Sequence, residues 1–151
     1  MAPVPLPSAV LFACTSNAIR SPMAEALMKR LHGRAVYVQS AGVRAGELDP
    51  FTIAVMDEIG IDLRRHRSRR FDELDDDSFD LIVSLSPEAQ HHAVEMTRIM
   101  ACDVEFWNIF DPTIIEGSRG ACLAAYRQVR DDLQQRILKR FPAVTTAVQI
   151  E

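Results

Sequence analysis

Residues 10–25 read VLFACTSNAIRSPMAE, and this stretch decides the fold. It opens with an apolar run of strand type that ends at Cys14. A polar loop follows and reaches Arg20 six positions after the cysteine. The pattern predicts a buried strand over residues 8–13 and a loop over residues 14–20.

The second half of the stretch has the pattern of a helix start. Ser21 followed by Pro22 is typical of an N-cap residue and of proline at the first helical position. We therefore expect a helix over residues 21–33, ending near its glycine. Its buried face is marked by apolar residues at four-residue spacing, namely Met23, Leu27 and Leu31.

A tight loop that leads into a helix N-terminus is suited to bind an anion, because its N–H groups converge and the helix dipole adds positive potential. Arg20 offers a planar fork for two oxygens of a phosphate-like group. In that field we expect Cys14 to favour its thiolate form, helped by a hydrogen bond from Ser21. Such a thiolate is a nucleophile aimed at phosphorus, and attack forms a phosphocysteine. The candidate phosphate-binding residues are Thr15, Ser16, Asn17, Ala18, Ile19, Arg20 and Ser21.

A structural interpretation of the same cysteine stays open at this point. A cysteine at the end of a buried strand is more often a small apolar core residue than a nucleophile. The spacing from Cys14 to Arg20 also arises by chance in unrelated proteins. The predicted strand before the loop and the Ser-Pro pair after it favour the catalytic interpretation, because context is what supports a short motif.

Several motifs together resemble the low-molecular-weight protein tyrosine phosphatase family, which also contains the thioredoxin-coupled arsenate reductases. The resemblance starts with Cys14 to Arg20 and residues 21–25 and covers nearly the whole chain. Its further parts are Ser40-Ala41-Gly42, Gly60-Ile61-Asp62-Leu63, His66 and Asp111-Pro112.

Size and composition fit one ordinary domain over residues 1–151, with an extended lead-in over 1–7 and a tail over 142–151. Apolar residues make up 48% and charged residues 25% of the chain, as in soluble globular proteins. A net charge of −4 gives no reason to expect nucleic acid, and no apolar run is long enough for a membrane span. No signal peptide is recognisable. Three widely spaced cysteines point to free thiols in a reducing, cytoplasmic setting.

The rest of the chain alternates strands and helices, which predicts an α/β fold with a parallel sheet covered by helices on both faces. Further strands are expected over 35–41, 79–85 and 104–107, and helices after Asp49-Pro50, after Ser86-Pro87 and over 117–140. The last helix is expected to bury Cys122 on its core face. The resemblance implies a three-layer domain whose four strands lie in the order 2-1-3-4. Ligands of such sheets bind beyond the carboxyl ends of the strands, where Cys14 falls.

A phosphocysteine mechanism needs one acid that also serves as a base. Asp111 follows the fourth predicted strand, so we expect it at the same sheet edge as Cys14, and the resemblance makes it the general acid. The resemblance also implies that Asn17, Ser40 and His66 support the loop. No cofactor and no metal are expected.

The basic run of residues 64–70 is followed by an acidic stretch. The simpler interpretation is a solvated surface with two compensating blocks of charge. The alternative is a basic rim that steers phosphorylated substrates to the anion site.

Three departures from the family pattern bear on function. Ile19 stands where many relatives carry a second loop cysteine, and Thr113 and Ile114 stand where eukaryotic relatives carry tyrosines. Ser86 and Ala93 stand where the reductases carry two further cysteines. We therefore predict a phosphomonoester hydrolase, with tyrosine phosphatase activity as its narrower form, acting on a phosphorylated protein or small phosphomonoester and holding inorganic phosphate or a similar oxyanion. The alternatives are an arsenate reductase that uses an external thiol, or a noncatalytic module that binds a phosphorylated ligand.

Overall fold

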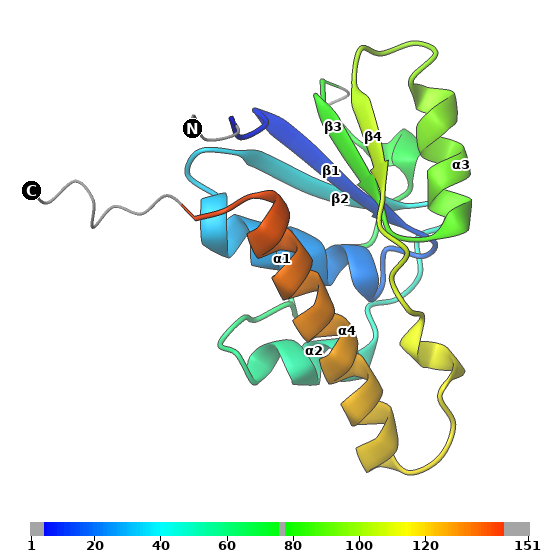
Figure 1. Cartoon of the computed structure of the whole chain (residues 1–151). Helices are drawn as coiled ribbons and strands as arrows, with labels where there is room; N and C mark the ends of the chain where they lie inside the picture. The colour runs from blue at the N-terminus through cyan, green and yellow to red at the C-terminus, as the bar shows by residue number, and fades with distance from the viewer. Residues whose placement is uncertain (1–4, 76–77, 144–151) are drawn as a thin grey trace, which may run out of the picture.

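The structure is a computed structural model that describes residues 5–75 and 78–143. Most of the expected lead-in and tail lies outside the described residues. Figure 1 shows the order of the elements along the chain. These are β1 (Ala9–Cys14), α1 (Arg20–His32), β2 (Tyr37–Gly42), α2 (Pro50–Asp57), the 3₁₀ helix η1 (Phe71–Glu73), β3 (Leu81–Ser84), α3 (Pro87–Met96), β4 (Asp103–Phe106), the 3₁₀ helix η2 (Pro112–Ile114) and α4 (Arg119–Arg140).

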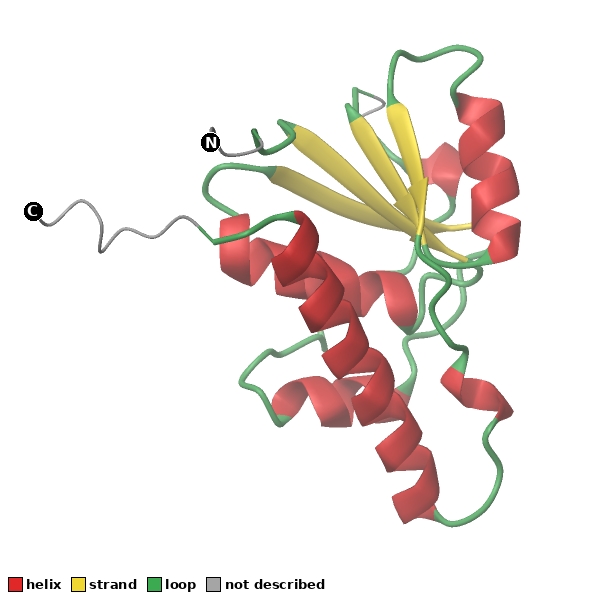
Figure 2. Ribbon diagram, in the orientation of Figure 1, coloured by secondary structure: helices red, strands yellow, loops and turns green. Residues whose placement is uncertain are grey.

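The four strands form one parallel sheet in the order β2-β1-β3-β4, which confirms the predicted fold. Figure 2 shows helices on both faces of this sheet. Strand β1 lies between β2 and β3, and all six of its residues are buried. The stretch that carries the loop therefore begins in the best-packed part of the domain.

Alternate residues of β1 point to opposite faces, because side chains along a strand alternate. Val10, Phe12 and Cys14 belong to the core shared with α1, α2 and α4. The smaller set Ala9, Leu11 and Ala13 packs with Ala89 and Ala93 of α3. The three layers are therefore α1, α2 and α4, then the sheet, then α3.

Two predicted helix starts are confirmed by the hydrogen bond that the N-cap side chain accepts. Asp49 caps α2 by accepting from Phe51 N, and Ser86 caps α3 by accepting from Ala89 N. Helix α1 differs from the prediction, because it begins one residue early, at Arg20, and has no side-chain cap. The Ser21 hydroxyl is not available as a cap because it faces the sulfur of Cys14.

The carboxyl ends of the strands meet at one edge of the sheet. In the register, Cys14 lies beside Gly42, while Ala13 lies beside Ser84 and Ser84 beside Phe106. The loops that follow the four strands therefore start close together, as parallel pairing requires. This edge carries the predicted site. Among the residues described, no helix is both long enough and apolar enough to cross a membrane.

The expected burial of Cys122 is wrong in degree. Its neighbours on the same face of α4 are buried, but Cys122 is only half-buried. It lies one turn into the helix, before α4 reaches the main core, and its thiol points to the carbonyl of Ile115 at 3.7 Å. The buried residues of this face are Tyr126, Val129, Leu133 and Ile137.

Candidate active site

The loop over residues 14–20 is held from outside through its carbonyl oxygens. The segment over residues 43–49 runs along it and donates backbone hydrogen bonds. These bonds join Val43 to Cys14 (3.1 Å), Arg44 to Thr15 (2.8 Å), Gly46 to Ser16 (2.8 Å) and Asp49 to Ala18 (3.3 Å). Within residues 5–75 and 78–143, no acceptor contacts the N–H groups of residues 15–20. Those donors are therefore free to bind an anion.

The sulfur of Cys14 has one close polar neighbour, the hydroxyl of Ser21 at 2.8 Å. Asn17 Nδ2 donates to the same hydroxyl oxygen, also at 2.8 Å. The amide is oriented by Arg69 N, which donates to Asn17 Oδ1 at 3.0 Å. Because Ser21 Oγ already accepts from Asn17, its own proton is free to point at the sulfur. The geometry therefore lets the Ser21 hydroxyl donate to the sulfur of Cys14.

Asn17 is the residue on which the shape of the loop depends. It is fully buried and has a positive φ of 52°, a conformation that asparagine tolerates better than most residues. Its side-chain amide also donates to Ser40 Oγ at 2.9 Å. Gly42 lets the next strand approach, because a Cβ there would lie 2.6 Å from Asn17 N. The loop and the end of β2 are thus built to fit each other.

Glu25 completes this network, although the sequence analysis did not single it out. Its buried carboxylate accepts from Ser40 at 2.5 Å and pairs with Lys29, also at 2.5 Å. His66 Nδ1 lies 3.8 Å from Glu25, and His66 Nε2 lies 3.2 Å from Asn17 Oδ1. Burial lowers the pKa of His66, and the Glu25 carboxylate offsets part of that shift. Asn17 therefore contacts both of the other support residues predicted from the resemblance, Ser40 and His66. Ser40 and His66 in turn both lie against the Glu25 carboxylate.

A signal for Glu25 was present in the sequence. It lies four residues after Ser21, and residues at that spacing share a helix face. A carboxylate on the same face as the residue predicted to contact the nucleophile has reason to be buried near the site.

We expect Asn17→Ala to loosen the loop. The substitution leaves the buried hydroxyls of Ser21 and Ser40 without their donor, which costs about 1–3 kcal/mol of stability. The Kd for inorganic phosphate should rise about tenfold, which corresponds to about 1.4 kcal/mol. Urea unfolding and phosphate titration measure the two effects. Asn108→Ala, at an exposed position, is the control. Unchanged phosphate affinity in Asn17→Ala would contradict the role of Asn17.

Arg20 and Asp111 reach the loop from two different elements. Arg20 is the first residue of α1 and is 9% exposed, and its Nη1 donates to Ile109 O at 3.1 Å. That bond ties α1 to the loop after β4, which carries Asp111. The half-buried Asp111 accepts from Thr113 through its Oδ1, at 3.0 Å from the amide and 2.7 Å from the hydroxyl.

A cavity of about 430 Å³ brings these residues together. Its lining includes residues of the loop, from Cys14 to Arg20, together with Asp111 and Thr113. Asn17 does not line the cavity, in keeping with its buried position behind the loop. A group held by the loop would therefore share one cavity with a sulfur and a carboxylate.

The cavity also has charged walls that the sequence analysis did not predict. They are formed by Arg44, Glu47, Asp49 and Glu88. Asp49 accepts from Tyr126 Oη at 2.9 Å, and burial together with this bond raises the pKa of Tyr126. Arg44 and Glu88 form an exposed ion pair at 3.4 Å. These charged residues come from segments far apart in the sequence, so no local sequence pattern could predict that they line one cavity.

The other two cysteines lie away from the cavity. Cys102 precedes β4 and so sits at the amino edge of the sheet, opposite the edge that holds Cys14. Cys122 is in the first turns of α4 and does not line the cavity. The residue beside the loop is a serine and not a cysteine: Thr15 Oγ1 donates to the hydroxyl of Ser86 at 3.0 Å.

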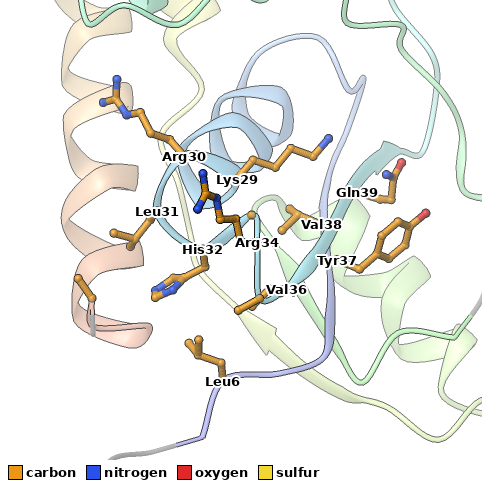
Figure 3. A pocket seen from close by; sticks show the side chains of 13 residues that line it. Leu6, Lys29, Arg30, Leu31, His32, Arg34, Val36, Tyr37, Val38 and Gln39 are labelled. Carbon is orange, nitrogen blue, oxygen red and sulfur yellow. The ribbon is translucent and has the colours of Figure 1, made fainter. Parts of the chain in front are cut away.

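A larger hollow, of about 780 Å³, lies elsewhere (Figure 3). It is formed by the end of α1 and the start of β2, so it opens at the amino edge of β2. Figure 3 shows Lys29, Arg30 and Arg34 around it, with no cysteine among its lining residues. It offers no cysteine nucleophile and is not the candidate active site.

The basic run over residues 64–70 does not line the cavity. Arg64 pairs with Asp57 at 2.6 Å, and Arg70 pairs with Asp72 at 3.1 Å. These exposed pairs fit the interpretation of compensating surface charges. The run approaches the site through contacts with Asn17 that come from the side chains of His66 and Ser68 and from the backbone of Arg69.

Comparison with known proteins gives a family match over nearly the whole chain. The family model described as low molecular weight phosphotyrosine protein phosphatase matches residues 9–149. An arsenate reductase of Halalkalibacterium halodurans is 34% identical over 130 residues, covering 85% of this chain and 91% of that protein.

Solved structures with similar folds include both reductases and phosphatases. An arsenate reductase in the phosphate-binding state has a TM-score of 0.67 and 28% identity, and the match covers 88% of this chain and 95% of that one. A variant of the YwlE arginine phosphatase with a phosphorylated active-site serine has a TM-score of 0.65 and 26% identity, with coverage of 89% and 97%.

Proposed function

This chain belongs to the low molecular weight phosphotyrosine protein phosphatase family, and on that premise we propose that it is a cysteine-dependent phosphomonoester hydrolase. The observation that carries the proposal is the single cavity lined by Cys14, Arg20 and Asp111. A nucleophile, a guanidinium and a carboxyl group around one anion-binding loop are the parts that phosphoryl transfer through a covalent intermediate needs.

In the first step, the Cys14 thiolate attacks phosphorus, forming an S–P bond while the bond from phosphorus to the leaving oxygen breaks. Asp111 gives its proton to that oxygen. Arg20 and the N–H groups of residues 15–20 hold the other phosphoryl oxygens. In the second step, Asp111 takes a proton from water, whose oxygen attacks phosphorus. The S–P bond breaks, and inorganic phosphate leaves with the thiolate restored.

Ser21 assists in this scheme by donating to the sulfur, and Asn17, Ser40 and His66 hold the loop in shape. The scheme uses no metal and no redox cofactor. The substrate is a phosphorylated protein or a small phosphomonoester, with phosphotyrosine as the narrower possibility. A free thiolate nucleophile suits a reducing compartment, so we assign the protein to the cytoplasm.

Arsenate reduction is a second candidate, favoured by the names of relatives such as the Halalkalibacterium protein. The same loop that holds phosphate also fits arsenate, as an oxyanion of the same shape. Reduction of As(V) to As(III) takes two electrons, which a second thiol supplies by forming a disulfide with Cys14 as arsenite leaves. Cys102 and Cys122 do not line the cavity, and Ser86 stands beside the loop where the reductases carry a cysteine. An external thiol such as glutathione would therefore have to complete the cycle. Phosphate transfer requires no such partner and remains our first choice.

Two assays on the purified, reduced protein separate the candidates. Hydrolysis of p-nitrophenyl phosphate is measured with EDTA, and arsenite formation from arsenate is measured with glutathione and glutaredoxin or with thioredoxin. We expect EDTA-resistant release of nitrophenol. Arsenite formation without phosphatase turnover would establish the reductase instead. Loss of both activities in a protein that still binds phosphate would establish the noncatalytic module.

A further inference from the structure

The cavity of the active site is rich in carboxylates for a site that binds an anion. Four acidic side chains line it, against two guanidinium groups. The guanidinium groups belong to Arg20 and Arg44. The carboxylates belong to Glu47, Asp49, Glu88 and Asp111. A phosphoryl group that enters adds further negative charge to this enclosure.

These carboxylates are not equally free to act on a substrate. Asp49 is engaged by Phe51 N at 2.8 Å and by Tyr126 Oη at 2.9 Å. Among the residues that the structure describes, Glu88 pairs only with Arg44, in a long and exposed contact at 3.4 Å. Glu47 is exposed and forms no ion pair with any residue in the described ranges. The mouth of the cavity therefore carries two carboxylates against the one guanidinium of Arg44, so its net charge is negative.

No aromatic ring lines the cavity in the described part of the chain. Beyond the loop, the segment after β4 contributes Asp111 and Thr113 to the lining. Thus nothing here holds the leaving group by ring stacking. Charge is left as the main property by which the mouth can select a substrate.

Resting on the proposed phosphatase function, we propose that this site selects substrates that carry a positive charge beside the phosphoryl group. Glu47 and Glu88 are the residues that attract this positive charge. A neutral or acidic leaving group would bring its phosphoryl dianion past like charges, whereas a cation beside the phosphoryl group offsets them. Two substrate types share this chemistry: a phosphorylated residue flanked by lysine or arginine, and a side-chain guanidinium that itself carries the phosphoryl group.

The test compares four peptides of equal length. Three contain phosphotyrosine flanked by lysine, alanine or glutamate, and the fourth contains phosphoarginine in the alanine context. We expect kcat/KM to fall from the lysine to the alanine to the glutamate peptide, by about tenfold per step at low salt. A preference for the lysine peptide alone assigns the cation to a neighbouring residue, and a preference for phosphoarginine assigns it to the modified side chain.

The variant for this test is Glu47→Gln combined with Glu88→Gln. The ratio of kcat/KM between the lysine and glutamate peptides should drop by about tenfold or more. Glu95→Gln is the matched control, because Glu95 lies on α3 like Glu88 but does not line the cavity. It should leave the ratio unchanged. Equal rates for all peptides, or the same ratio in the double variant, would overturn the proposal.

Binding measurements keep this result separate from the proposed function. Dissociation constants of the same peptides for Cys14→Ser need no turnover and should follow the same order. If that order holds without hydrolysis by the wild type, the charge preference stands and the phosphatase function fails. If nitrophenyl phosphate is hydrolysed but the peptides show no order in rate or binding, the phosphatase function stands and the charge preference is wrong.

Discussion

Cys14→Ser is expected to abolish turnover while leaving oxyanion binding intact. The hydroxyl is a far weaker nucleophile than the thiolate, so kcat for p-nitrophenyl phosphate should fall by about 10⁴-fold or more. The loop N–H groups and Arg20 are unchanged, and the carbonyl bonds that hold the loop do not involve the sulfur. Inorganic phosphate should therefore still raise the Tm of the variant. Steady-state kinetics and thermal unfolding with and without phosphate measure the two parts.

Cys102→Ser is the matched control for this prediction, because it makes the same chemical change at the opposite edge of the sheet. It should keep wild-type rates. Turnover that survives in Cys14→Ser would rule out the phosphocysteine mechanism. Loss of both turnover and phosphate binding would mean that the sulfur is needed for the shape of the loop.

Asp111→Asn is expected to slow the first chemical step by about 10²–10⁴-fold, the usual contribution of a general acid. Asparagine keeps an oxygen that can accept from Thr113, so the loop around position 111 should keep its shape. The loss should be larger for phenyl phosphate than for p-nitrophenyl phosphate, because the poorer leaving group depends more on the proton.

Asp103→Asn serves as the control, since Asp103 is an exposed residue at the amino end of β4. Rates for both esters are compared in the wild type and the two variants. Equal losses for both esters in Asp111→Asn would show that the carboxyl group acts in positioning or electrostatics instead of proton transfer.

Much of the fold could be predicted because its signals are local. The apolar run before Cys14, the Asp49-Pro50 and Ser86-Pro87 caps and the alternation of strands and helices all lie within short windows. The strand order came from the family resemblance and is confirmed. The start of α1 was misplaced because a serine before proline usually caps a helix, whereas here tertiary contacts with Cys14 determine the direction of the hydroxyl.

The site divides in the same way. The residues of the loop are adjacent in sequence, so their meeting could be expected. Glu25 is coupled to Ser40 and His66 only through the fold, and Arg44 and Glu47 reach the cavity from the loop after β2 and Glu88 from the start of α3. No pattern in a single sequence predicts that these distant residues become neighbours, because this depends on which strands are adjacent in the sheet.

The position of Cys14 has a consequence for local unfolding, which amide hydrogen exchange measures. The cysteine is the last residue of β1, which is paired on both sides and completely buried. Segments of this kind exchange their amide hydrogens only when the whole domain unfolds. The amides of β1 should therefore be among the slowest to exchange in the molecule, while those of the loops over 43–49 and 107–111 exchange through smaller openings. On this expectation, the nucleophile is attached to the strand that opens last, and adaptation to different substrates is left to the segments that surround it.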